Sequence, residues 1–293
     1  MVKFEGCGTA LVTPFFADGN VDINAYTKLI DRQAASGVDF LVALATTGET
    51  PTLSVDEKVT LLRITYEHAV FKGKRLPILV GCGSNSVAGT LANMEALAPC
   101  KDMVDAWLVV VPFYNKPTQE GQYRYFRTIA EHSDKPIVIY NVPGRTGANM
   151  TAETCLRLAS VPGIIGIKEA SGKYDQIAGI LKGAPDGFAV LSGDDDMTLS
   201  IMEIGAKGVI SVASNIMPDK VSAMTAAALK GDFAEAHRID DSLKPLYKAC
   251  FVESNPIPAK AALSLLGLCG DTMRLPLTSA TDGTYELLRS ILG

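Results

Sequence analysis

The stretch Ala106-Trp107-Leu108-Val109-Val110-Val111 is apolar throughout and lacks the alternation expected of a strand that has one face in water. Runs of this kind are typical of parallel strands that are buried on both faces. Seven further β-rich runs lie at residues 9–12, 40–43, 77–81, 136–140, 164–168, 189–192 and 208–212. Eight such strands, each followed by a helix, predict an α/β fold of the (β/α)8 barrel type, with a doubly wound open sheet as the alternative.

The segments between these runs carry the signals that start helices. Ser54 and Glu57 form the pattern of a capping box, and Ser86, Thr118 and Thr151 stand where the first residue of a helix is expected to be capped. Beyond residue 215 the strand signals stop, and helices are expected at residues 221–230, 233–251, 256–266 and 284–292. We therefore expect a barrel over residues 1–225 and a C-terminal helical extension over residues 226–293.

The composition indicates a globular protein with one large core. Of the 293 residues, 47% are hydrophobic and 20% are charged, a balance that favours extensive burial. The net charge is −5 and the basic residues are scattered, so nucleic acid is not an expected partner. The six cysteines are widely spaced without a CxxC pair, which predicts neither a disulfide framework nor a zinc site.

The first residues and the hydropathy pattern predict where in the cell the protein is found. Residues 1–6 contain no apolar segment of the kind found in signal peptides, and no stretch is long enough to span a membrane. From these two observations we expect no membrane association and a cytoplasmic location.

Lys168 ends the apolar run Ile164-Ile165-Gly166-Ile167. Strict alternation would place Ile164, Gly166 and Lys168 on one face, with Ile165 and Ile167 on the other. Desolvation disfavours the charged form of an amine, and a neutral amine is what attacks a carbonyl group to form a Schiff base. Taken alone, the pattern favours the other interpretation, a strand-end lysine whose stem lies on apolar surface and whose ammonium reaches water, because charged residues are rarely buried unless paired.

Polar residues gather where the predicted strands end. In a (β/α)8 barrel the active site lies at the C-terminal ends of the strands, so these residues should converge. They include Thr46, Thr47, Tyr114, Tyr140, Arg145 and Lys168. An amine, phenols, hydroxyls and a guanidinium are the groups that a carbonyl-condensing aldolase needs, and no metal or other cofactor is required. Asp194-Asp195-Asp196 is interpreted as a set of acids that opens a helix rather than as metal ligands.

Seven stretches in this order resemble the dihydrodipicolinate synthase family, which belongs to the pyruvate-dependent class I aldolases. The resemblance covers essentially the whole chain and is carried by residues 46–49, 112–117, 140–147, 166–170, 192–195, 208–212 and 255–258. It implies a lyase that condenses pyruvate with L-aspartate 4-semialdehyde on the diaminopimelate route to lysine. It also implies a homotetramer, described as a dimer of dimers.

The resemblance assigns catalytic roles to four residues. Lys168 is expected to form the Schiff base with the keto carbon of pyruvate. Tyr140, Thr46 and Tyr114 resemble the members of the family's hydroxyl relay, and the family takes the last of these from the neighbouring subunit. These roles are implied by the resemblance alone.

Four further residues are expected to bind substrates. Thr47 is expected to hold the pyruvate carboxylate, and Gly193 and Ile210 match the residues that line the pyruvate pocket. Arg145 matches the residue that binds the carboxylate of the second substrate, for which a planar guanidinium is well suited. Relatives of the N-acetylneuraminate lyase and keto-deoxy sugar acid aldolase types lack this arginine. Such an aldolase is the alternative, followed by a non-catalytic keto-acid sensor.

The resemblance also bears on regulation. Lysine-sensitive members of the family bind lysine in a cleft that includes an asparagine, a glutamate four residues later and a tyrosine just before the relay tyrosine. Here Asn85 is retained, whereas Gly89 and Phe113 replace the other two, and Lys58 replaces a common histidine. We therefore expect lysine to be a weak inhibitor of this protein.

Overall fold

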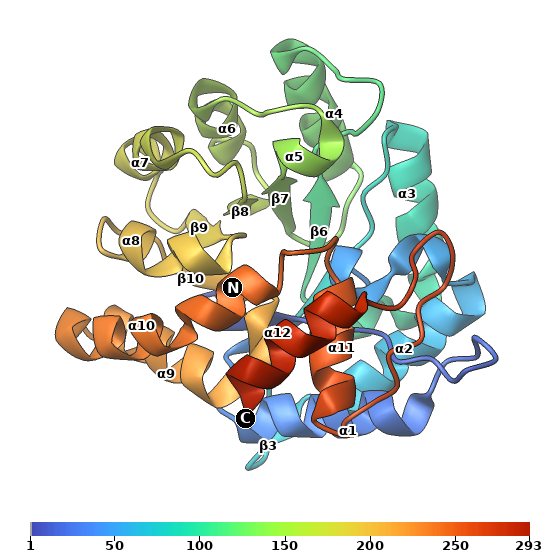
Figure 1. Cartoon of the computed structure of the whole chain (residues 1–293). Coiled ribbons are helices and arrows are strands. Elements are labelled where there is room, and N and C mark those ends of the chain that lie inside the picture. The colour runs from blue at the N-terminus through green and yellow to red at the C-terminus, as the bar shows by residue number, and fades with distance from the viewer. Residues whose placement is uncertain (1) are drawn as a thin grey trace.

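Eight parallel strands close into a barrel in the computed structural model, which describes residues 2–293 (Figure 1). Around the barrel the strands follow the order β1-β10-β9-β8-β7-β6-β5-β2. They are β1 Gly6–Ala10, β2 Phe40–Ala43, β5 Ile78–Gly81, β6 Ala106–Val110, β7 Ile137–Asn141, β8 Ile164–Glu169, β9 Ala189–Ser192 and β10 Gly208–Ser211. The prediction of a (β/α)8 barrel is confirmed, and the open-sheet alternative is wrong.

Helices surround the barrel and continue past its last strand. They are α1 Ile23–Ala35, α2 Val55–His68, α3 Val87–Ala96, α4 Gln119–Glu131, α5 Pro143–Thr146, α6 Ala152–Ala159, α7 Tyr174–Gly183, α8 Thr198–Met202, α9 Pro218–Leu229, α10 Phe233–Ala249, α11 Ile257–Leu265 and α12 Asp282–Leu292. Short 3-10 turns are η1 Thr46–Gly48, η2 Thr50–Thr52, η3 Ala98–Met103, η4 Asp195–Met197 and η5 Ala213–Asn215. A small hairpin, β3 Val70–Phe71 and β4 Lys74–Arg75, was not predicted, because two-residue strands leave no periodicity to detect.

The expected helix starts are present. Ser54 and Glu57 form a reciprocal capping box at the start of α2. The hydroxyls of Ser86, Thr118 and Thr151 each accept a backbone hydrogen bond at the first turn of α3, α4 and α6. Each cap satisfies a donor that the helix itself cannot pair, so these local sequence signals set the helix boundaries.

Alternation along the strands separates two apolar clusters. Leu108 of β6 belongs to the cluster that fills the barrel, together with Val138 and Ile210. Trp107 and Val109 of the same strand belong to the larger cluster between the sheet and the surrounding helices. Because both faces of each strand are buried, β6 reads as one continuous apolar run.

A bulge in β8 interrupts the alternation expected around the lysine. Ile137 pairs with Ile164 and Val138 pairs with Gly166, so Ile165 is the extra residue. Ile164 packs in the outer cluster and Ile165 against the inner one, the reverse of the prediction. An extra residue shifts the alternation by one position, and the expected order returns from Gly166 onward.

The C-terminal extension is helical, as predicted. In Figure 1 the orange and red helices α10, α11 and α12 follow α9 in sequence, and α10 packs against α9 while α12 packs against α11 and α10. The boundary predicted between residues 225 and 226 falls within α9, and the division into two units stays a prediction. Residues 255–274 of this extension contact the turn that follows β2.

Candidate active site

Lys168 and Tyr140 lie side by side on neighbouring strands. The two residues are register partners in the parallel pairing of β7 with β8. The Lys168 side chain is buried, at 5% exposure, and its Nζ lies 4.2 Å from the centroid of the Tyr140 ring. An amine in van der Waals contact with an aromatic face is shielded from bulk water, as a nucleophilic lysine requires.

The backbone after β9 packs against the stem of this lysine. The Gly193 amide donates to the carbonyl of Glu169 at 2.7 Å, which draws the β9 loop onto β8. A Cβ at position 193 would lie 3.1 Å from Cε and 3.2 Å from Cγ of Lys168. A side chain at position 193 would crowd this stem and, at 2.6 Å, the Cβ of Ala170, so glycine allows the loop and β8 to approach this closely. Ile210 of β10 is fully buried in the cluster inside the barrel, to which Tyr140 also belongs.

The acidic residues Asp194, Asp195 and Asp196 after β9 lie at the start of the 3-10 turn η4. Burial, together with the charge of Asp196, raises the pKa of Asp194 to about 6. Asp195 opens the 3-10 turn η4, as expected, and its carboxylate also accepts hydrogen bonds from the amides of Val212 and Ala213, at 2.9 and 3.0 Å. It thereby holds the end of β10 against η4. Within residues 2–293, no three His, Cys, Asp or Glu side chains gather as a metal site would require.

Thr46 and Thr47 occupy the 3-10 turn η1, directly after β2. Thr47 is buried, and its hydroxyl accepts a hydrogen bond of 3.0 Å from the Nδ2 of Asn255. The carbonyl of Gly48 accepts a hydrogen bond of 2.8 Å from the Thr13 hydroxyl. The turn is thus held from both sides, while Thr46 faces the cavity described below.

Arg145 lies on the short helix α5 that follows β7. Its Nη2 donates to the backbone carbonyl of Asn255 at 3.3 Å. The same asparagine therefore contacts two of the predicted substrate-binding residues, Thr47 through its side chain and Arg145 through its backbone. Sequence reasoning named Asn255 only as part of a motif and did not assign it this position.

A cavity of about 510 Å³ opens at this end of the barrel. Thr46, Tyr140 and Arg145 line it, and Lys168 lies next to this lining, against the ring of Tyr140. Lys58 and Phe113, which replace residues of the lysine-binding cleft in lysine-sensitive relatives, also line this cavity. Among the described residues that line the cavity there is neither an aspartate nor a glutamate, so its charged groups are cationic.

Tyr114 is the one predicted catalytic residue that does not join the site. Its side chain is 86% exposed, and its backbone adopts a positive φ of 72°. A tyrosine in the left-handed region is uncommon, and here its phenol lies in solvent rather than in the buried cluster of Tyr140. Its amide donates to the carbonyl of Thr146 at 3.2 Å, which fixes the segment beside α5.

Comparison with known proteins agrees with this arrangement. A family model described as the dihydrodipicolinate synthetase family matches residues 3–293. The chain belongs to this family. This match confirms the resemblance inferred from the seven stretches. It extends over nearly the whole chain.

Family members similar to this chain include both sequences and solved structures. A 4-hydroxy-tetrahydrodipicolinate synthase of Koribacter versatilis is 50% identical over 276 residues, which cover 94% of this chain and 91% of that protein. The dihydrodipicolinate synthase structure from Thermotoga maritima has a TM-score of 0.94 at 42% identity, covering 99% of this chain and 97% of that one. A chloride-inhibited dihydrodipicolinate synthase from Acinetobacter baumannii, complexed with pyruvate, has a TM-score of 0.94 at 39% identity and covers 99% and 98%.

Two further observations on this member of the dihydrodipicolinate synthase family concern its helices and its histidines. Within the described part of the chain, no helix is both long and apolar enough to cross a membrane. His68 and His237 form exposed pairs with Asp31 and Glu203, at 2.9 and 2.7 Å. These histidines are surface residues and take no part in the site.

Proposed function

We propose that this chain is a 4-hydroxy-tetrahydrodipicolinate synthase that condenses pyruvate with L-aspartate 4-semialdehyde. The observation that carries the proposal is the buried amine of Lys168, 4.2 Å from the ring of Tyr140 at the C-terminal end of the barrel. Curated relatives that are 44–50% identical over nearly the whole chain carry this enzyme name. The reaction belongs to lysine biosynthesis through diaminopimelate.

Covalent catalysis by Lys168 explains why an amine is buried here. The neutral amine attacks the keto carbon of pyruvate, and loss of water gives a Schiff base. Loss of a methyl proton then converts the Schiff base into an enamine, whose terminal carbon attacks the aldehyde of the second substrate. Tyr140 lies against the amine and is positioned to carry protons to and from the adduct.

The remaining site residues bind the two substrates. Thr47 is proposed to orient the pyruvate carboxylate, and Gly193 and Ile210 to form the wall of the pyruvate pocket. Arg145 lines the cavity, its guanidinium donates to the carbonyl of Asn255, and it forms no ion pair within residues 2–293; it is proposed to bind the carboxylate of aspartate semialdehyde. This arginine favours an acidic aldehyde over the sugar substrates of the alternative aldolases.

The exposure of Tyr114 supports an active site completed by a second copy of the chain. Its phenol cannot join Thr46 and Tyr140 in one relay from its position on this chain, at 86% exposure. In the proposed homotetramer, the Tyr114 phenol of one chain would enter the site of its neighbour. The homotetramer and the cytoplasmic location remain predictions.

Trapping with borohydride tests the function. The protein is incubated with pyruvate and sodium borohydride, and the modified residue is located by peptide mass mapping. We expect one reduced adduct, on Lys168, and condensation activity in an assay coupled to the next enzyme of the pathway.

The Lys168→Ala variant should trap no pyruvate, and its activity should fall below about a hundredth of the wild-type activity. The matched control is Lys173→Ala, which removes an exposed lysine five positions away. Absence of an adduct in the wild-type protein would refute the proposal.

A further inference from the structure

A fully buried ion pair joins the C-terminal extension to the turn after β2. Lys260 of α11 donates to Oε1 of Glu49 at 2.8 Å, and both side chains are 0% exposed. The ammonium also donates to the carbonyl of Thr272 at 2.6 Å and lies 4.3 Å from the centroid of the Phe15 ring. The second carboxylate oxygen of Glu49 accepts from the Arg274 amide at 3.2 Å.

Glu49 lies at a strained point of the turn. It links η1 to η2 and has a φ of 52°, in the left-handed region. For a residue other than glycine this conformation is unfavourable, and it persists where surrounding contacts impose it. The contacts that impose it here come from Lys260 and Arg274, more than 200 positions away in the sequence.

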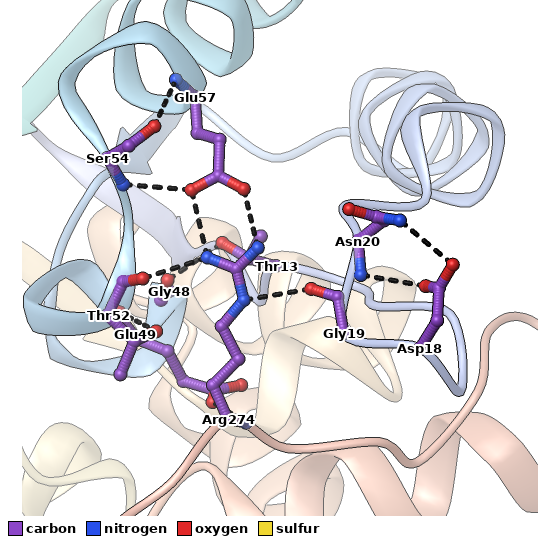
Figure 2. A network of polar contacts seen from close by, with 10 residues as sticks. All are labelled: Thr13, Asp18, Gly19, Asn20, Gly48, Glu49, Thr52, Ser54, Glu57 and Arg274. Carbon is purple, nitrogen blue, oxygen red and sulfur yellow. Dashed lines mark hydrogen bonds and ion pairs between the residues drawn. The ribbon is translucent and has the colours of Figure 1, made fainter.

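Figure 2 shows the outer part of this connection. Arg274 reaches from the extension to the carboxylate of Glu57, to the carbonyl of Thr52 at 2.8 Å and to the carbonyl of Gly19 at 2.9 Å. Both ends of η2 are thereby fixed. The inner part is made by Asn255, whose Nδ2 donates to the Thr47 hydroxyl.

Stability alone does not account for the buried pair. Removing two charges from water costs free energy that their attraction repays only in part, and apolar residues of similar volume often serve as well. The pair does have a geometric consequence, because it fixes the conformation of the residue that follows the turn of Thr46 and Thr47. If the turn shifts, Thr47 holds the pyruvate carboxylate less well, which weakens pyruvate binding and raises the KM for pyruvate.

We infer that Lys260 and Asn255 are positioning residues: from the C-terminal extension, they hold the turn that carries Thr46 and Thr47 in the geometry that pyruvate binding requires. The inference rests on the proposed function. Neither residue is proposed to touch the substrate. Asn255 acts on the hydroxyl of Thr47, and Lys260 acts on the turn through Glu49.

Two variants test the inference. The double variant Glu49→Gln with Lys260→Met removes both charges without leaving one buried alone, and the new amide oxygen can still accept from Arg274. Asn255→Ala removes the hydrogen bond to Thr47 and keeps the backbone carbonyl that contacts Arg145. For each we expect the KM for pyruvate to rise roughly tenfold to a hundredfold, and borohydride trapping at subsaturating pyruvate to slow by a similar factor. The KM for aspartate semialdehyde, and kcat at saturating pyruvate, should change less than threefold.

The control is an ion pair at the opposite end of the barrel. Arg75 and Asp105 form a two-pronged contact, both prongs at 2.7 Å, before the start of β6. The double variant Arg75→Met with Asp105→Asn should keep wild-type kinetics.

The outcomes separate the inference from the proposed function. Wild-type pyruvate KM and trapping rate in a folded Asn255→Ala variant, or in a folded Glu49→Gln, Lys260→Met variant, would overturn the inference and leave the function intact. Should the double variant fail to fold, Asn255→Ala decides, since it removes no charge. Failure of the wild-type protein to trap pyruvate would overturn both.

Discussion

Replacing Gly193 by alanine should disable the site while the barrel stays folded. The new Cβ would lie 2.6 Å from the Cβ of Ala170 and 3.1 Å from the Cε of Lys168. Because carbon atoms pack at about 3.5–4.0 Å, these contacts are short by about 0.9–1.4 Å and about 0.4–0.9 Å. Ala170 has no flexible side chain to move aside, so the loop and the lysine stem must separate.

The size of this displacement sets the expected effect. A shift of about 1 Å in a reacting group can cost about a hundredfold in rate. Overpacking costs about 1–3 kcal/mol of unfolding free energy, which is less than the ~5–15 kcal/mol of a typical protein. We therefore expect Gly193→Ala to remain folded and to trap pyruvate on Lys168 at least about tenfold more slowly than the wild-type protein.

The rate of pyruvate trapping and the unfolding temperature, measured on the same preparations of wild-type and Gly193→Ala protein, test this prediction. The control is Gly283→Ala on α12, where an added Cβ meets nothing within 4 Å. It should trap pyruvate at the wild-type rate and unfold at the same temperature or slightly higher, since alanine favours a helix. A Gly193→Ala protein that traps at the wild-type rate would show that the loop can yield, and would refute the reasoning.

Three more predictions follow from the charged groups. Arg145→Ala should lower kcat/KM for aspartate semialdehyde about ten- to a hundredfold, equivalent to roughly 1.5–3 kcal/mol, while pyruvate trapping persists; an equal loss of trapping would contradict the assigned role. L-lysine should half-inhibit only above about 1 mM at saturating pyruvate, because Lys58 repels its amine and Gly89 supplies no carboxylate; inhibition below that concentration would contradict this. The hydrogen bond from Arg274 lowers the pKa of Glu57 from 4.5 to about 2, so its contribution to stability is present above pH 4.5 and is lost as the pH falls toward 2. The difference in unfolding free energy between wild-type protein and Glu57→Gln, measured in urea, should accordingly shrink from pH 7 to pH 3, and a constant difference would exclude this linkage.

Structural features that depend only on residues close together in the chain could be predicted from the sequence. The apolar run that ends at Lys168 predicted a buried strand, and the capping box of Ser54 and Glu57 predicted the start of α2. Both signals act within one turn or one strand, so a short window contains all the interactions that produce them. The bulge at Ile165 was missed, because nothing within β8 requires it.

The sequence by itself determined the eight strands, the helices between them and the position of the lysine at a strand end. Only the tertiary structure placed that lysine against the ring of Tyr140, which lines the cavity, and left Tyr114 exposed. It alone brought Asn255 to Thr47 and Lys260 to Glu49, across 208 and 211 positions. Periodicity decides which face of a strand a side chain takes, because it is local. Contacts between distant segments depend on how the whole chain packs, and no local pattern encodes them.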